Sequence, residues 1–216
     1  MAGAQRLRER ALAADLGGAK QSWIDARAGW ERSEVFTGGF VPQLDKEIDA
    51  WPEARSGFHA IEAKLFGANR TDIEAESQSL VQSLTELSGT VRGIPLTAQG
   101  LLNGIAQLAY ELGESKVDGG ESRISGTSLA DMRNNVLGIA RAYHTILAAA
   151  IEATDPALAA AADRQLDALK AILDTADLRQ VDSERLRGLS EELVVTLQSA
   201  APAIGLKKPV LESGAQ

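Results

Sequence analysis

The sequence contains no cysteine among its 216 residues. Disulfide bonds and thiolate metal sites are therefore excluded, and any bound metal must be held by oxygen and imidazole ligands. Aromatic residues make up only 4% of the chain, so alanine and leucine supply most of the apolar surface. Such a composition favours close helix packing over a sheet core rich in Val, Ile and Tyr.

Basic residues are also few, since 22 Lys and Arg stand against 30 Asp and Glu and give a net charge of −8. This deficit argues against a nucleic-acid surface, which needs positive charge to neutralise phosphates. It is compatible with cation binding, but many acidic soluble proteins bind none. No apolar run approaches the roughly 20 residues that span a bilayer. Residues 1–8 offer no signal-peptide stretch, so we expect a cytoplasmic protein or one whose leader has been removed.

Apolar residues recur with helical spacing, and no segment shows the alternation of a strand. Glycines, prolines and capping side chains divide the chain into seven or eight helices with short connections, which predicts antiparallel neighbours in an all-α helical bundle. The expected helices cover about 7–36 (with a possible break at 17–18), 54–66, 71–91, 97–112, 128–153, a segment beginning at 156, and 183–201. Residues 113–126, rich in Gly and Ser, form the longest expected loop.

The most informative local feature is the segment 57–62, Gly-Phe-His-Ala-Ile-Glu. His59 and Glu62 are three residues apart and therefore neighbours on one helix face. That face also carries Phe58 and Ile61, so it is expected to point inward, where an unpaired Glu is costly. One interpretation is that His59 and Glu62 pair with each other or with a core partner, and the other is that they bind a metal. The spacing differs from the HExxH motif of zinc proteases.

Other candidates carry weaker signals. Glu34 projects beside Trp23 and Trp30 on the apolar side of the first helix and has no local partner of opposite charge. Glu31 is interpreted as an i,i+4 partner of Arg27.

Three further acidic or imidazole features have simple structural interpretations. The acidic segment 44–51 is typical of a solvated surface turn. Asp131 can be the acid of a capping box opened by Ser128, and His144 is interpreted as a packing histidine. The sequence has no GxSxG elbow, phosphate-binding glycine loop or cysteine nucleophile.

Residues 57–67, GFHAIEAKLFG, resemble the GFHxxExxLfG signature of imelysin-like proteins, and more particularly of the EfeO/EfeM type. Three further stretches agree in order: residues 31–34 are similar to the YERxE segment, residues 44–49 to LDxxID, and residues 129–135 to LWDFxAN. The resemblance covers roughly residues 20–150. It is closest to the short, EfeM-like form without a cupredoxin-like domain.

This resemblance implies a single imelysin-like helical domain over residues 1–216, built as paired four-helix bundles, with frayed ends at the first few residues and at about 205–216. It implies a metal site, with iron the expected ion and zinc, manganese or calcium as alternatives. The implied ligands are His59, Glu62, Glu34, Asp49 and Asp131. The His and first Asp of the HTDLWDF stretch of many relatives are missing at residues 126–128, which puts a ligand from that loop in doubt.

The resemblance also implies a function: a periplasmic or cell-surface protein, its leader removed, that delivers iron to an inner-membrane permease. We expect a carrier that neither spans the membrane nor binds nucleic acid. A metallopeptidase is a second interpretation, because imelysins have been classed with metallopeptidases and Glu62 could act as a general base on a metal-bound water. A third is binding of acidic polysaccharide, which the net negative charge opposes.

Overall fold

The computed structural model describes residues 1–37, 40–49 and 55–211, and every regular element within them is helical, as predicted. Residues 50–51 of the expected acidic segment, residue 54 of the expected helix and residues 212–216 of the tail lie outside the described residues. The α-helices are α1 (Ala2–Leu12), α2 (Leu16–Ser33), α3 (Pro42–Asp49), α4 (Gly57–Glu62), α5 (Glu74–Gly93), α6 (Ala98–Glu114), α7 (Ser128–Ala142), α8 (Ala148–Thr154), α9 (Pro156–Leu173) and α10 (Ser183–Ala200). The chain divides into two compact units, which are described separately below.

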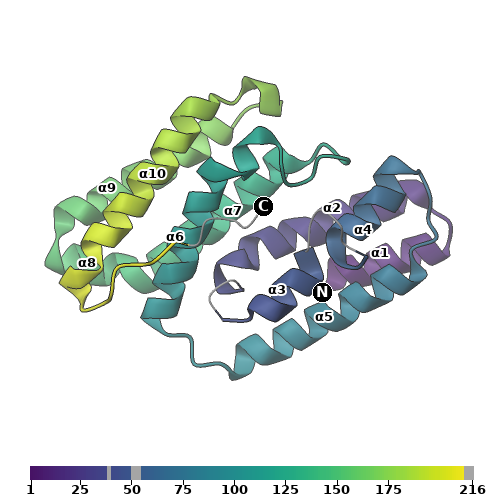
Figure 1. The fold of residues 1–216 in the computed structure, drawn as a ribbon, viewed down its shortest axis with the longest axis horizontal. Coiled ribbons are helices and arrows are strands. Elements are labelled where there is room, and N and C mark those ends of the chain that lie inside the picture. The colour runs from purple at the N-terminus through teal and green to yellow at the C-terminus, as the bar shows by residue number, and fades with distance from the viewer. Residues whose placement is uncertain (38–39, 50–54, 212–216) are drawn as a thin grey trace. The chain divides into compact units, whose positions relative to one another are not determined.

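Unit 1 consists of Met1–Trp30, Val41–Pro95 and Ser122–Thr127. Its long helix α5 packs against α1, α3 and α4 (Figure 1). Trp23 of α2 is fully buried and meets Phe58 of α4 edge to face, with ring centroids 6.1 Å apart. These aromatic rings anchor α4 to α2, because such pairs add to the stabilisation that burial provides.

Unit 2 consists of Glu31–Phe40, Leu96–Glu121 and Ser128–Gln216. Helix α10 packs along α6 and α9, while α7 packs on the same two helices, so the four form a bundle (Figure 1). Leucine, isoleucine and alanine fill its interior, with Ile105, Leu166 and Leu197 fully buried. This is the Ala- and Leu-rich helical core that the composition predicts.

One continuous helical stretch in the described chain, Ser128–Thr154, is long and apolar enough by length and composition to span a membrane. It comprises α7, the π-helical turn η4 (Tyr143–Leu147) and α8. Core residues of unit 2, among them Ile139 and Tyr143, lie on this stretch and are fully buried. The core helix of a soluble bundle meets the same criterion, so the stretch is weak evidence for a membrane span.

Local capping explains where several helices begin. Asp155 caps α9, since its Oδ1 accepts from the amides of Ala157 and Leu158 at 3.1 Å, as the Asp-Pro pair predicts. The break in the expected 7–36 helix falls at residues 13–15, ahead of the two glycines. There Ala14 adopts a φ of 55° and Asp15 Oδ1 accepts from the Gly18 amide at 2.9 Å. Asp15 therefore opens α2 three residues before the glycine to which it bonds.

The capping box expected at Thr71 is wrong. Helix α5 begins at Glu74 with Ile73 as its N-cap, and no side chain caps it. Ile73 is fully buried, so packing of its side chain fixes the start of the helix where a hydroxyl was expected to do so.

Candidate metal centre

A glycine allows α3 and α4 to approach closely enough to form the centre. Gly57, the first residue of α4, has a φ of +75°, and a Cβ at this position would collide with the backbone of Glu47 and Ile48. Both conditions select glycine. The close approach brings Asp49, the last residue of α3, to His59 on the first turn of α4.

The two ring nitrogens of His59 each face a carboxylate. Nε2 lies 3.3 Å from Asp49 Oδ1, and Nδ1 lies 3.0 Å from Glu62 Oε2. The His59 side chain is only 3% exposed. Burial alone would lower the pKa of His59, but the hydrogen bonds with Asp49 and Glu62 prevail and raise it to about 9. The two carboxylates therefore favour the imidazolium form of His59.

Asp49 is held by two donors from α2. The Arg27 guanidinium donates to Oδ1, and the Trp30 indole Nε1 donates to Oδ2 at 2.8 Å. Arg27 is 1% exposed, and its guanidinium carbon lies 5.4 Å from the centroid of the Phe58 ring. Burial favours the protonated acid, but the charges of Arg27 and His59 outweigh it and hold the pKa of Asp49 far below its usual range. The surface-turn interpretation is wrong for Asp49, which is only 9% exposed.

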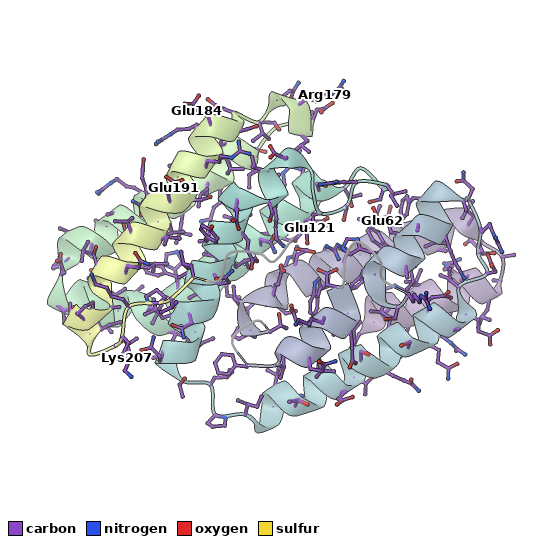
Figure 2. The ribbon with its side chains drawn as sticks, viewed as in Figure 1. Glu62, Glu121, Arg179, Glu184, Glu191 and Lys207 are labelled. Atoms are coloured by element: carbon purple, nitrogen blue, oxygen red, sulfur yellow. The ribbon has the colours of Figure 1, made fainter. Side chains whose placement is uncertain are left out.

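A short loop segment of unit 1 holds Glu62, which is labelled in Figure 2. The fully buried Oε1 accepts from the Ile124 amide at 3.2 Å and from both the amide and the hydroxyl of Ser125 at 2.7 Å. The Gly126 amide closes this turn by donating to the Ser122 carbonyl at 2.9 Å. Burial opposes ionisation, but bonds from His59 and Ser125 lower the pKa of Glu62. The expected long loop therefore contributes donors to the centre.

Charges within this centre balance, because Arg27 and His59 are cationic while Asp49 and Glu62 are anionic. His59 and Glu62 pair with each other, as one of the two interpretations of the sequence predicts, and this pairing is compatible with metal binding. Two atoms that share one ion at about 2.0–2.2 Å each lie roughly 3–3.5 Å apart. The 3.3 Å between His59 Nε2 and Asp49 Oδ1 falls in this range. An imidazole with carboxylates is the donor set of iron, zinc or manganese sites.

Glu34 belongs to a second charged cluster, which lies within unit 2. It begins the 3₁₀ turn η1 (Glu34–Phe36), and its two carboxylate oxygens accept from Lys116 Nζ at 3.0 and 3.1 Å. The same ammonium lies 3.5 Å from Glu31 and 3.2 Å from Glu121, which is labelled in Figure 2. Asn135 Nδ2 donates to both Glu31 and Glu34, at 2.8 and 2.7 Å.

The remaining sequence candidates also lie in unit 2. Asp131 occupies the first turn of α7 and is buried, and its ligand role stays a prediction. His144 is half exposed and lies 3.7 Å from the Asp163 carboxylate. It is therefore a surface residue, and the packing interpretation is wrong.

The sequence analysis did not identify several residues that hold the two clusters, among them Arg27, Trp30, Ser125 and Lys116. Arg27 lies three residues before Trp30 on the apolar face of α2, and that spacing could have marked it as a buried cation. Ser125 and Lys116 come from a Gly- and Ser-rich segment, whose sequence carries no periodicity that places side chains.

Comparison with known proteins gives a consistent set of relatives. The family model of imelysin (Peptidase_M75) matches residues 1–56 and 53–202. The chain is 29% identical over 150 residues to the iron uptake system component EfeM of Bacillus subtilis (strain 168). This match covers 64% of this chain and 37% of that protein. It is 31% identical over 171 residues to the iron uptake system component EfeO of Yersinia pseudotuberculosis serotype I (strain IP32953). That match covers 74% of this chain and 45% of that protein.

A third relative is an "Efem/EfeO family lipoprotein" of Staphylococcus haemolyticus (strain JCSC1435), 26% identical over 170 residues, which cover 74% of this chain and 59% of that protein. The matched region thus spans between 37% and 59% of the length of these three relatives.

Proposed function

Because this chain belongs to the imelysin family, we propose that it binds a metal ion, with iron the leading candidate, at the His59 centre of unit 1. It would act outside the cytoplasm as a component of an iron-uptake system and pass the ion to a membrane permease. The names of its relatives support the role, since two are iron uptake system components and one is a lipoprotein. The geometry at His59 supports the position of the site.

The observation that carries the proposal is the arrangement of carboxylates on both sides of the His59 ring. Metal-ligating histidines usually donate their second ring N–H to a carboxylate, which fixes the tautomer and makes the other nitrogen a better ligand. Glu62 takes this place at Nδ1, and three donors from Ile124 and Ser125 hold Glu62 in turn. Nε2 is then the ligating atom, and it already faces Asp49.

Binding at this position exchanges an ion for a proton. A proton on Nε2 satisfies Asp49 Oδ1, and an ion placed between the two atoms would take over that role. A direct ligand role for Glu62, which the family resemblance implies, needs its Oε2 to leave His59. Such a role for Glu34 or Asp131 stays a prediction.

Entry and release of the ion require side chains to move, because Asp49, His59 and Glu62 are all less than a tenth exposed. A carrier must hold its ion and then give it up, so delivery would depend on this movement. The net charge of −8 attracts cations to the molecule as a whole.

Calorimetry on chelator-treated protein tests the proposal, with Fe(II), Fe(III), Zn(II) and Mn(II) titrated separately. The wild type should bind one ion, and a folded His59→Ala/Glu62→Ala variant should bind none. His144→Ala is the matched control, since His144 is the second of the two histidines, lies on the surface and should leave binding unchanged. Equal binding by the wild type and the His59→Ala/Glu62→Ala variant would overturn the proposal.

A further inference from the structure

Three buried or half-buried carboxylates of unit 2 have the spacing of a metal site. Glu31, Glu34 and Glu121 each place one carboxylate oxygen within 4.8 Å of the other two. They come from three different segments: α2, η1 and the residues after the 3₁₀ turn η3 (Lys116–Asp118). Oxygen ligands of this kind and number suit a hard divalent cation.

A protein cation already lies among these carboxylates. Lys116 is 4% exposed, and its ammonium lies 3.5 Å from Glu31, 3.0 Å from Glu34 and 3.2 Å from Glu121. An ammonium group has three N–H donors and no acceptor. The Lys116 ammonium donates to both carboxylate oxygens of Glu34 and to Glu121, and Glu31 adds a third negative charge beside it. Lys116 thus has the coordination partners that a metal ion would have at this position.

The backbone keeps Lys116 in place. It begins η3 two residues after α6 ends, and the Gly119 amide closes that turn by donating to the Lys116 carbonyl at 3.0 Å. Gly119 has the positive φ of 71° that ends such a turn. The long side chain is therefore anchored at a fixed point of the α6 terminus, from which it enters the cluster.

The electrostatics agree with this placement. Burial alone would lower the pKa of Lys116, but Glu121, Glu34 and Glu31 outweigh it and raise the pKa well above the ordinary lysine value. For Glu34, burial and the neighbouring carboxylates outweigh Lys116 and raise the pKa. The geometry and the charges thus agree that Lys116 is the counter-charge of these carboxylates.

We propose that Lys116 is a tethered counter-cation that occupies the position of a metal ion among Glu31, Glu34 and Glu121 and excludes metal from this cluster. Glu34 is then a partner of Lys116, in place of the ligand role implied by the family resemblance. The exclusion of metal by Lys116 does not depend on the proposed function at the His59 centre.

Mn(II) binding to variants that lack His59 tests the exclusion separately. The His59→Ala protein should bind no Mn(II) at this cluster. Adding Lys116→Met should create one Mn(II) site, because the ammonium that occupies the position among the carboxylates is gone and its charge no longer repels the ion. Adding Glu34→Gln should abolish that new site. Lys170→Met is the matched control, because Lys170 is an exposed lysine of unit 2 that pairs with Asp167, and it should create no site.

Two results would overturn the proposal. One is a folded His59→Ala/Lys116→Met protein that binds no more Mn(II) than His59→Ala. The other is a His59→Ala protein that binds one Mn(II) and loses it on Glu34→Gln, because the carboxylates would then hold metal beside Lys116. The second experiment needs no change at Lys116, so it tests the exclusion of metal even where Lys116→Met fails to fold. Failure of the wild type to bind metal would refute the proposed function but would leave both tests of Lys116 valid.

Discussion

Replacing Arg27 by methionine should expose how strongly the centre depends on its buried cation. Methionine keeps most of the apolar stem of Arg27, so the change mainly removes the charge beside Asp49. Asp49 would keep Trp30 and His59 as donors. Because removal of one partner leaves a buried charge uncompensated, we expect the free energy of unfolding to fall by about 3–5 kcal/mol.

Urea denaturation followed by circular dichroism measures this loss, with the slope m checked for constancy. Arg10→Met is the control, since Arg10 forms an exposed pair with Asp15 at 3.1 Å and should cost less than about 1 kcal/mol. The double variant Arg27→Met/Asp49→Asn should recover at least about 2 kcal/mol relative to the sum of the single losses. Equal losses for Arg27→Met and Arg10→Met, or additive losses in the double variant, would refute the reasoning.

Three further predictions concern the same centre. Gly57→Ala should lower the free energy of unfolding by at least about 2 kcal/mol, because of the positive φ at this position and the clash with α3. Gly89 lies on the exposed face of α5 with open space around it, so Gly89→Ala should be neutral or slightly stabilising in the same urea titration. Ser125→Ala should cost about 1–2 kcal/mol by removing one donor from buried Glu62; a loss no larger than that of Ser199→Ala, an exposed serine bonded to its own helix, would contradict this role. The pKa of His59 is raised to about 9 from 6.5, so its charged form stabilises the fold fully below pH 6.5. This contribution amounts to up to about 3 kcal/mol and is lost as the pH rises to 9. Urea midpoints of wild type and His59→Gln should therefore converge over that range, and a constant difference would count against the imidazolium assignment.

The His59–Glu62 pair could be predicted from sequence because a helix fixes the geometry of residues three apart. The helical fold could be predicted for the same reason, since periodicity and capping act locally, as at Asp155. Asp49 came only from the family resemblance. Its own segment indicates a surface turn, and the approach of α4, which Gly57 permits, is what buries it.

The partners contributed by residues 116–125 could not be predicted. Ser125 reaches Glu62 across 63 positions of sequence, and Lys116 reaches Glu34 across 82. Contacts over such separations depend on how the units fold, and no local pattern encodes them. The failed capping box at Thr71 has a related cause, because burial of Ile73 sets the start of α5.

The most direct test of the central claim is the X-ray absorption spectrum of the full chain loaded with one equivalent of iron or zinc. The account predicts scattering from one imidazole together with oxygen ligands near 2.0–2.2 Å, and loss of the imidazole signal in the His59→Gln protein. An oxygen-only shell in the wild type, unchanged by His59→Gln, would contradict the claim that the ion binds at His59.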